Sequence, residues 1–256
     1  MLIKPFGFKW KRIQKKVFFW ILFFVVIKIS PSLAQFDACP PSRQILIFVT
    51  YAGLYERKNK FEKAIEYYNE ALSLTREFED RRWETFVLTK IAKIYEKKRN
   101  FDEALKYFEE ALEASLEEKD KALIYCNIAK IYLNRGNYQR AIEFLNMGIK
   151  IGEEVKDSQS LGICMITLGE IYKEIGNFQK AEVLLKEGLK KVLEAGDETY
   201  EAIVYENLGS LYLYIKNINL AKQYFIKAYH IYKSLGFKSK TKEILLILKN
   251  IENERS

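Results

Sequence analysis

Apolar residues recur at three- and four-residue spacing from about residue 45 onward, which predicts a succession of amphipathic helices. Short polar stretches separate these helices in pairs, at residues 58–60, 98–100, 134–137, 174–177 and 215–217. An aromatic residue or Ile follows each turn, where it can close the helix pair: Phe61, Phe101, Tyr138, Phe178 and Ile218. The pattern predicts five helix-turn-helix units.

The five units are copies of one another with a period of about forty residues. A small residue in the first helix of each unit lies at position 52, 92, 129, 169 or 209, so the spacings are 40, 37, 40 and 40 residues. Each unit then has a tyrosine three positions later and an alanine twelve positions later: Tyr55 and Ala64, Tyr95 and Ala104, Tyr132 and Ala141, Tyr172 and Ala181, Tyr212 and Ala221. Small residues let antiparallel helices approach while the tyrosine fills the space beside them, which explains why both types recur.

Two further positions of the second helix repeat as well. A large residue lies at Tyr68, Phe108, Leu145, Leu185 and Phe225, and a small one at Ala71, Ala111, Gly148, Gly188 and Ala228. Together these positions resemble the tetratricopeptide repeat family, in its longer variant of about forty residues. Two features depart from the family pattern: the closing proline is missing, and the tryptophan of the first helix is replaced by Phe48, Leu88, Tyr125, Met165 and Tyr205.

The resemblance implies an all-α, right-handed α-solenoid of five helix-turn-helix repeats plus a C-terminal capping helix. We expect the repeats at residues 45–80, 81–119, 120–157, 158–197 and 198–236, after an irregular lead-in over 35–44 that contains Pro40 and Pro41. Residues 237–256 are expected to form the capping helix and tail, with a polar outer face.

Four aspartates precede the expected first helices of the later repeats, at Asp80, Asp120, Asp157 and Asp197. We interpret them as N-caps or turn residues. A ring of acidic metal ligands is excluded, because stacked repeats would place each aspartate in a separate loop.

The N-terminus carries a targeting signal. Basic residues between Lys9 and Lys16 precede an apolar run over residues 17–27, and Pro31 and Ser32-Leu33-Ala34 follow. This order predicts a secretory signal peptide over residues 1–34, cleaved after Ala34, because the apolar run is too short for a comfortable membrane span. We therefore expect an exported protein, periplasmic or secreted.

Two alternatives stay open at this end of the chain. An uncleaved signal anchor extending through Ile29 would tether the protein to the membrane, with the repeats on the same exported side. Lipid modification at Cys39 is the other, although Phe36 and Asp37 fit the lipoprotein box poorly. No second apolar stretch is long enough to cross a bilayer, so no span is expected after signal cleavage.

Composition and charge exclude several function classes. The 256 residues are 49% hydrophobic with only 12 Gly and 4 Pro, which disfavours disorder and loop-rich sheets. The net charge of +8 comes almost entirely from seven basic residues within residues 1–35, so the repeats are nearly neutral and a nucleic-acid partner is not indicated. The chain has no nucleotide-binding or nucleophile-elbow motif, and its single histidine, His230, is expected on the surface. We therefore expect no enzyme activity, catalytic residue, metal or cofactor.

Three cysteines give no regular framework of disulfides. Cys126 and Cys164 fall in the first helices of neighbouring repeats, so one disulfide between them is conceivable in an oxidising compartment. We favour the interpretation that both are small buried apolar residues. Cys39 would then be a free thiol or an intermolecular linker.

The resemblance implies that the first helices line a concave groove that binds an extended or helical segment of a partner protein. Residues offset from the packing face are the candidates for that groove: Lys90, Lys93, Lys97, Asn127, Lys130, Asn134, Lys173, Asn207 and Tyr214. Lys90, Lys93, Asn127 and Lys130 lie in adjacent repeats and could together meet an acidic group. Asn127 and Asn207 share a repeat position at which members of the family commonly hold a ligand's main chain. The alternative is a solvated charged helix face.

The sequence thus predicts an exported protein-interaction scaffold with a peptide or helix as its partner, and the central basic residues favour an acidic one. A sensory or regulatory module that acts through a separate effector is the second hypothesis. An enzyme is the third, and it would require a cleft of perturbed acids that the sequence does not show. Partner identity and oligomeric state do not follow from the sequence.

Overall fold

The computed structural model describes residues 41–253, and this part of the chain is entirely helical, with no strand. Eleven α-helices follow one another within it: α2 (Pro41–Arg57), α3 (Phe61–Glu77), α4 (Arg81–Lys97), α5 (Phe101–Ala114), α6 (Glu118–Asn134), α7 (Tyr138–Glu154), α8 (Ser158–Glu174), α9 (Phe178–Ala195), α10 (Glu198–Tyr214), α11 (Ile218–Ser234) and α12 (Lys238–Asn253). The predicted signal peptide, its cleavage site and Cys39 lie outside the described residues.

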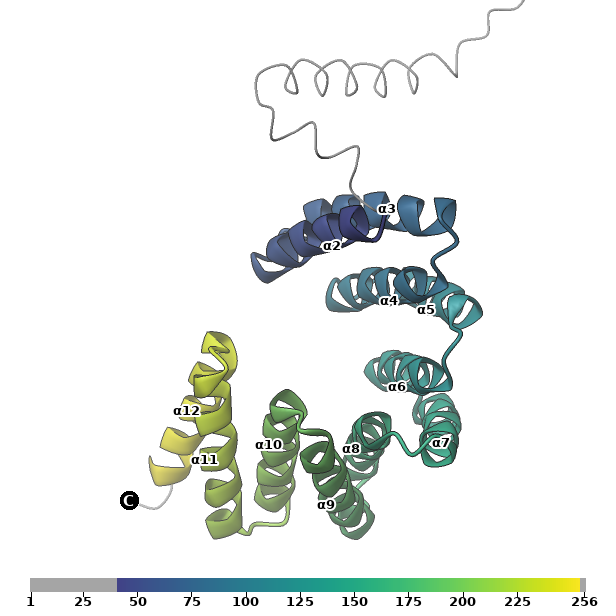
Figure 1. The fold of residues 1–256 in the computed structure, drawn as a ribbon. Helices are drawn as coiled ribbons and strands as arrows, with labels where there is room; N and C mark the ends of the chain where they lie inside the picture. The colour runs from purple at the N-terminus through teal and green to yellow at the C-terminus, as the bar shows by residue number, and fades with distance from the viewer. Residues whose placement is uncertain (1–40, 254–256) are drawn as a thin grey trace, which may run out of the picture.

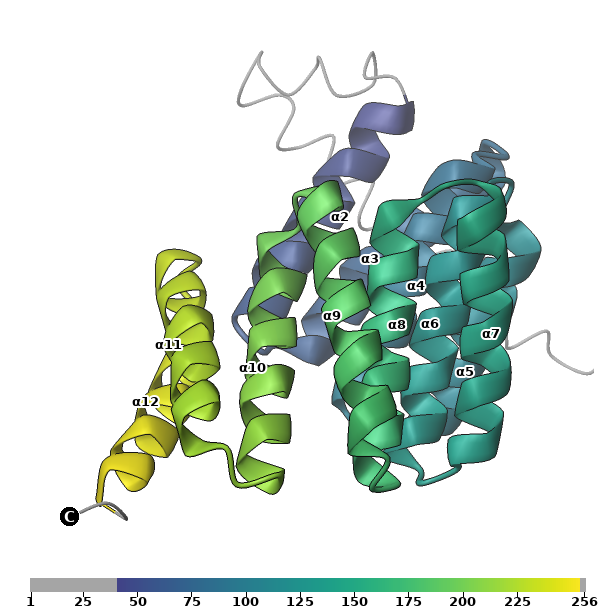
Figure 2. The ribbon, with the colours of Figure 1, turned by 90° about the horizontal axis from the view of Figure 1, so that it is seen from below.

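The helices form five antiparallel pairs, from α2/α3 to α10/α11, and α12 follows alone. Figure 1 shows the pairs arranged along an arc, with α4, α6 and α8 on its inner side and α5, α7 and α9 on its outer side. Seen from below in Figure 2, the helices from α6 to α9 stand side by side, and α12 ends the array. The predicted all-α solenoid of five helix pairs with a C-terminal helix is confirmed.

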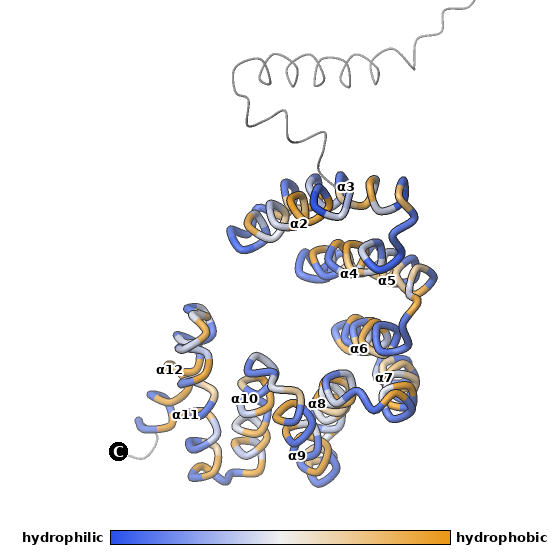
Figure 3. Tube along the Cα trace, viewed as in Figure 1, coloured by the Kyte–Doolittle hydropathy of each residue, from blue (hydrophilic) through white to orange (hydrophobic). Residues whose placement is uncertain are grey.

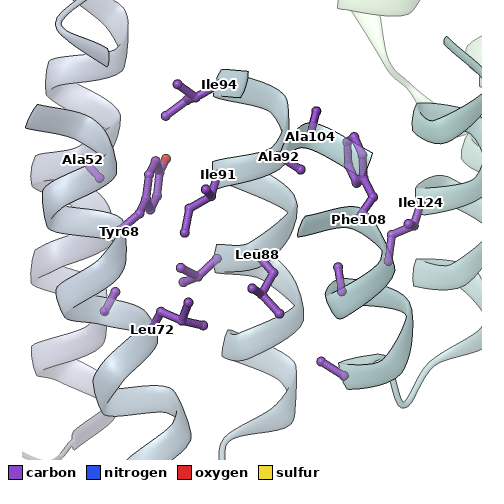
Figure 4. Packing of buried hydrophobic residues seen from close by; sticks show 14 of the residues in the cluster. Ala52, Tyr68, Leu72, Leu88, Ile91, Ala92, Ile94, Ala104, Phe108 and Ile124 are labelled. Carbon is purple, nitrogen blue, oxygen red and sulfur yellow. The ribbon is translucent and has the colours of Figure 1, made fainter. Parts of the chain in front are cut away.

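Small residues in both helices of a pair let the helices pack closely. Ala52, Ala92 and Ala104 are fully buried, and Figure 4 shows them beside the large buried side chains Tyr68 and Phe108. In later repeats glycine takes the same role. A Cβ atom on Gly209 would lie only 2.9 Å from the ring of Phe225 in the partner helix. The small and large positions of the repeat are therefore complementary parts of one core, and in Figure 3 every helix carries both apolar and polar residues, as this packing requires.

The turn inside each pair has one residue in the left-handed conformation, always at the same place in the repeat: Asn59, Arg99, Gly136, Gly176 and Lys216. Glycine adopts this conformation without strain, and asparagine tolerates it better than most residues. An asparagine then caps the second helix in three repeats: the side chains of Asn137, Asn177 and Asn217 accept hydrogen bonds from the backbone N–H three residues later.

Three of the four aspartates act as predicted. The side chains of Asp80, Asp157 and Asp197 cap α4, α8 and α10, accepting hydrogen bonds from the backbone N–H of Trp83, Ser160 and Tyr200.

The prediction for Asp120 is wrong, because α6 begins at Glu118 and the aspartate lies in its first turn. The preceding helix α5 has only 14 residues and ends in extended backbone at Ser115. The three residues missing from this repeat therefore shorten α5 and move the cap position to Glu117.

The N-terminal end of the array differs in detail from the sequence prediction, and the C-terminal end agrees with it. Helix α2 begins at Pro41 and not after residue 44, because proline is well suited to the first position of a helix. At the other end, Lys249 and Glu252 occupy the positions that Gly209 and Tyr212 hold one repeat earlier. Glu252 forms an ion pair with Lys222 at 2.7 Å, so α12 presents charge where a further helix would have to pack.

Candidate functional site

The inner face of the arc contains a cavity of about 500 Å³ that we call the basic cavity. It is lined by residues of α4, the turn after it, the start of α5, α6 and the start of α10: Lys93, Glu96, Lys97, Arg99, Phe101, Asn127, Lys130, Asn134 and Tyr200. Five of the nine predicted groove residues meet here, and they come from two neighbouring first helices. Four cationic side chains against one carboxylate make the cavity suited to a negatively charged group.

Lys93 lies at the centre of this charge. Burial, together with the nearby cations Lys130 and Lys90, lowers the pKa of Lys93 to about 8, and the carboxylate of Glu96 offsets this only in part. Within residues 41–253 no carboxylate forms an ion pair with its ammonium group. An ammonium that is partly desolvated and surrounded by like charge is stabilised by any anion that enters the cavity.

Lys130 is held in place by a residue from two repeats further on. Its Nζ donates a hydrogen bond to the hydroxyl of Tyr200 at 3.3 Å and lies 5.0 Å from the centre of the same ring. Burial lowers the pKa of Lys130, but Tyr200 and Glu170 together raise it above its ordinary value. The backbone of Tyr200 is itself fixed by the cap of α10, since its N–H donates to Asp197.

The single acid of the basic cavity responds to the same surroundings. Burial raises the pKa of Glu96, while Lys130, Lys93 and Lys97 act in the opposite direction. Lys97 is drawn toward the first repeat, where its Nζ lies 2.6 Å from Glu56. The two lysines that remain for a ligand are therefore Lys93 and Lys130, and Asn127, which lines the same cavity, is only 5% exposed.

The structure places the other predicted groove residues apart from the basic cavity. Lys173 donates to the side chain of Asn207 at 3.4 Å, and Asn207 donates to Glu170 at 2.6 Å, so these residues already satisfy one another. Tyr214 is 61% exposed and stacks on Phe178, with ring centres 6.0 Å apart.

Lys90 does not line the basic cavity. It lies on two neighbouring cavities, and the larger of these, about 850 Å³, is formed between α2 and the turn that precedes α12. The two ends of the array therefore approach one another across the opening that Figure 1 shows.

Sequence reasoning missed four residues of the basic cavity. Three of them are close in sequence to the groove-facing positions of α4: Glu96, Arg99 and Phe101. A helical projection that continued through the turn would therefore have found them. Tyr200 could not have been found in this way. It reaches the cavity only because the array curves enough to bring the start of α10 beside α6.

Cys126 and Cys164 are joined in a disulfide between α6 and α8, with Cα atoms 5.3 Å apart. Both are fully buried, as predicted, but the favoured interpretation of two unpaired residues is wrong. Gly148 of α7 makes room for the bridge, because a Cβ atom there would lie 2.8 Å from the sulfur of Cys164. Cys126 directly precedes Asn127, which lines the basic cavity.

Other chemistry is not found among the described residues. No group of three or more His, Cys, Asp or Glu side chains within residues 41–253 is arranged to hold a metal ion. His230 is exposed on α11 and contacts Tyr229 edge to face. No helix of residues 41–253 is long and apolar enough to span a bilayer.

Tetratricopeptide repeat models match residues 43–117, 120–194 and 202–236. The chain belongs to the tetratricopeptide repeat family. None of the curated proteins is similar enough in sequence to count as a relative.

Solved structures share the fold at low sequence identity. NprR in complex with its cognate peptide NprX is 16% identical with a TM-score of 0.70, and the match covers 99% of this chain and 76% of NprR. The apo form of RapI is 18% identical with a TM-score of 0.58, over 83% of this chain and 59% of RapI. A signal transduction ATPase with a tetratricopeptide repeat sensor, from Pyrococcus horikoshii, is 20% identical with a TM-score of 0.60; the match covers 87% of this chain but only 34% of that protein.

Proposed function

We propose that this tetratricopeptide repeat protein is an exported, non-catalytic scaffold that binds an acidic segment of a partner protein on its inner face. The observation that carries the proposal is the pair Lys93 and Lys130 in the basic cavity. Neither lysine has a carboxylate in an ion pair within residues 41–253, and both are partly withdrawn from water. A carboxylate of the partner would pair with them in a setting where charge-assisted hydrogen bonds are strong.

Asn127 gives the same site a second mode of recognition. Its amide can both donate and accept, which suits the N–H and C=O groups of an extended peptide backbone. The peptide complex of NprR supports this proposal as an example of the same fold that binds a peptide.

Export is supported by the leader and by the disulfide. Disulfides persist in oxidising compartments and are rare in the cytosol, and the Cys126–Cys164 bridge lies in the core of the array. We propose that the signal peptide over residues 1–34 delivers the chain to the periplasm or the exterior. An uncleaved anchor would place the same groove on the same side of the membrane.

A sensory or regulatory role is the second candidate. NprR is described as a quorum sensor, and the similar repeats of the Pyrococcus protein as a sensor, which supports a role in which peptide binding is passed to an effector. A second binding partner whose association changes when the acidic segment binds would distinguish this role from a plain scaffold.

The proposal is tested by charge reversal with a matched control. The variant Lys93→Glu with Lys130→Glu should lose the partner that the unaltered chain captures from an envelope fraction, as identified by mass spectrometry. The control variant Lys106→Glu with Lys150→Glu makes the same change at exposed positions on α5 and α7, the outer helices of the same two repeats. It should capture the partner normally, and both variants should keep the helical circular dichroism spectrum. Capture that survives in the first variant would refute the assignment of the groove.

A further inference from the structure

A second cavity adjoins the basic cavity on the inner face, and we call it the apolar subsite. It measures about 340 Å³ and lies between the first halves of α4 and α6, where Phe86, Leu123 and Ile124 supply apolar surface. Lys93 lines both cavities. A ligand held by Lys93 therefore continues directly into the apolar subsite or ends beside it.

Phe86 is the main apolar feature of this subsite. It is 41% exposed, although large aromatic side chains are mostly withdrawn from water. Trp83 contacts its ring edge to face, with centres 5.5 Å apart, and the ammonium of Lys90 lies 5.2 Å from its centre. These two contacts hold the ring in place, so a ligand that covers it need not order it first.

The two helices that form both cavities are in register. The spacing between these repeats is 37 residues, so Phe86 corresponds to Leu123, Lys90 to Asn127, and Lys93 to Lys130. Each helix thus presents an apolar side chain and, seven residues later, a cation. Seven residues of α-helix rise about 10.5 Å, which separates an apolar level from a basic level.

The charges along the groove give a bound segment a direction. Asp120 lines the apolar subsite, and burial together with the nearby carboxylate of Glu117 raises its pKa. Arg82, on the same subsite, is engaged by Glu117 at 3.0 Å. Lys90 and Lys93 also line this subsite, whereas the basic cavity has four cations against one carboxylate. An acidic side chain is therefore favoured more strongly at the basic level, and the exposed ring of Phe86 favours an apolar side chain at the apolar level.

We propose that the groove selects a segment with an aromatic or large aliphatic side chain three residues from an acidic one, the apolar side chain entering the apolar subsite. In a polyproline II conformation, residues three apart lie on the same side and are separated by about 9.3 Å, close to the distance between the two levels. This inference rests on the proposed function, since it takes the basic cavity as the acidic anchor. It adds the apolar subsite as the determinant of which acidic segments bind.

The test uses the full chain and fluorescein-labelled peptides of about twelve residues in a Gly/Ser background, measured by fluorescence anisotropy. Each parent peptide carries Phe and Glu three positions apart, and both orders are tested. Matched peptides have Ala in place of Phe or Gln in place of Glu. For one of the two orders we expect replacement of Phe by Ala to weaken binding about tenfold or more, as loss of a buried aromatic side chain should. In the variant Phe86→Ala the Phe and Ala peptides should bind alike, whereas Phe86→Leu should keep most of the preference.

The control variant is Phe78→Ala, which removes another exposed phenylalanine, outside both cavities, and should leave the preference unchanged. Equal binding of the Phe and Ala peptides by the unaltered chain, or a preference that survives Phe86→Ala, overturns the inference while the dependence on Glu upholds the proposed function. If neither Glu nor Phe strengthens binding, both fail. The circular dichroism spectrum of each variant shows that it is folded.

Discussion

Tyr95 and Tyr107 stack across the two helices of the second repeat, with ring centres 5.4 Å apart and planes inclined by 10°. The same pair recurs with nearly the same geometry as Tyr55–Tyr67, Tyr132–Phe144 and Tyr212–Tyr224. The fourth repeat has Leu184 in place of the second ring, and there Lys180 lies 4.1 Å over Tyr172 and donates to its hydroxyl. The recurring tyrosine therefore joins the two helices of each pair.

This stack should be measurable as a coupling energy. Replacing Tyr107 by Leu, the residue that the fourth repeat has naturally, should lower the free energy of unfolding by about 1 kcal/mol, because the ring contact is lost while most apolar area remains. Urea unfolding of Tyr95→Leu, Tyr107→Leu and the double variant measures the coupling. The sum of the losses in free energy of unfolding of the two single variants should exceed the loss in the double variant by about 0.5–1.5 kcal/mol. Strictly additive losses would contradict a direct interaction between the two rings.

The two glycines Gly209 and Gly53 should respond to the same substitution with opposite signs. A Cβ atom on Gly209 would lie 2.9–3.0 Å from the ring of Phe225, which is 1% exposed and cannot move aside. We expect Gly209→Ala to lower the free energy of unfolding by about 1–2 kcal/mol, since overpacking outweighs the better helix propensity of alanine.

Gly53 also lies within a helix, but nothing is within 4 Å of its Cβ position. Gly53→Ala should therefore raise the free energy of unfolding by about 0.5–1 kcal/mol. The measurement is again the urea midpoint at constant slope. A stabilising Gly209→Ala would mean that α10 and α11 are further apart than the structure has them.

The disulfide gives a third prediction. It closes a loop between residues 38 apart, and the chain-entropy relation for a loop of this length gives a stabilisation of about 3–4 kcal/mol. Cys126→Ala with Cys164→Ala should therefore lower the urea midpoint, and dithiothreitol should lower it for the unaltered chain but not for the variant. Thiol titration of the unfolded, unreduced chain should detect Cys39 alone. Three titratable thiols would rule the bridge out.

Much of the fold could be predicted because it depends on residues that repeat. The positions of Ala92 and Tyr95, for example, are held by a small residue and a tyrosine in every unit. The local spacing of apolar residues is sufficient to place both on the packing face of a helix. Asp120 shows where this reasoning fails. It lies nine residues before Ala129, whereas the three capping aspartates lie twelve residues before Ala92, Gly169 and Gly209, so the equivalent position is Glu117. The residue type of Asp120 favours a cap, but the shorter α5 leaves it inside the first turn of α6.

The candidate site was predictable to the same extent. Lys93 and Lys130 could be placed together because they hold equivalent positions in adjacent repeats. The contact between Lys130 and Tyr200 spans 70 residues and depends on the curvature of the array, which arises from many small packing angles. The Cys126–Cys164 pair has a similar origin, since only the spacing of α6 and α8 decides whether two buried cysteines can bond.

The lowered pKa of Lys93 predicts how peptide binding depends on pH. Because this pKa is about 8 in the free chain, Lys93 loses its charge as the pH rises through 8, and an acidic peptide must then restore the proton in order to pair with it. Affinity for a Glu-containing peptide should be constant at lower pH and then fall by up to about tenfold per pH unit above 8. Anisotropy titrations from about pH 6.5 to 9.5 measure this decline, and Lys93→Arg should remove it, since arginine stays protonated throughout. A decline in affinity that persists in Lys93→Arg would assign the titration to another group and leave Lys93 without a role in binding the acidic side chain.

The same pKa affects the stability of the peptide-free chain in the opposite direction. Between about pH 8 and the ordinary lysine value of 10.5, the folded chain holds fewer protons than the unfolded chain. The free energy of unfolding should therefore rise with pH across this interval.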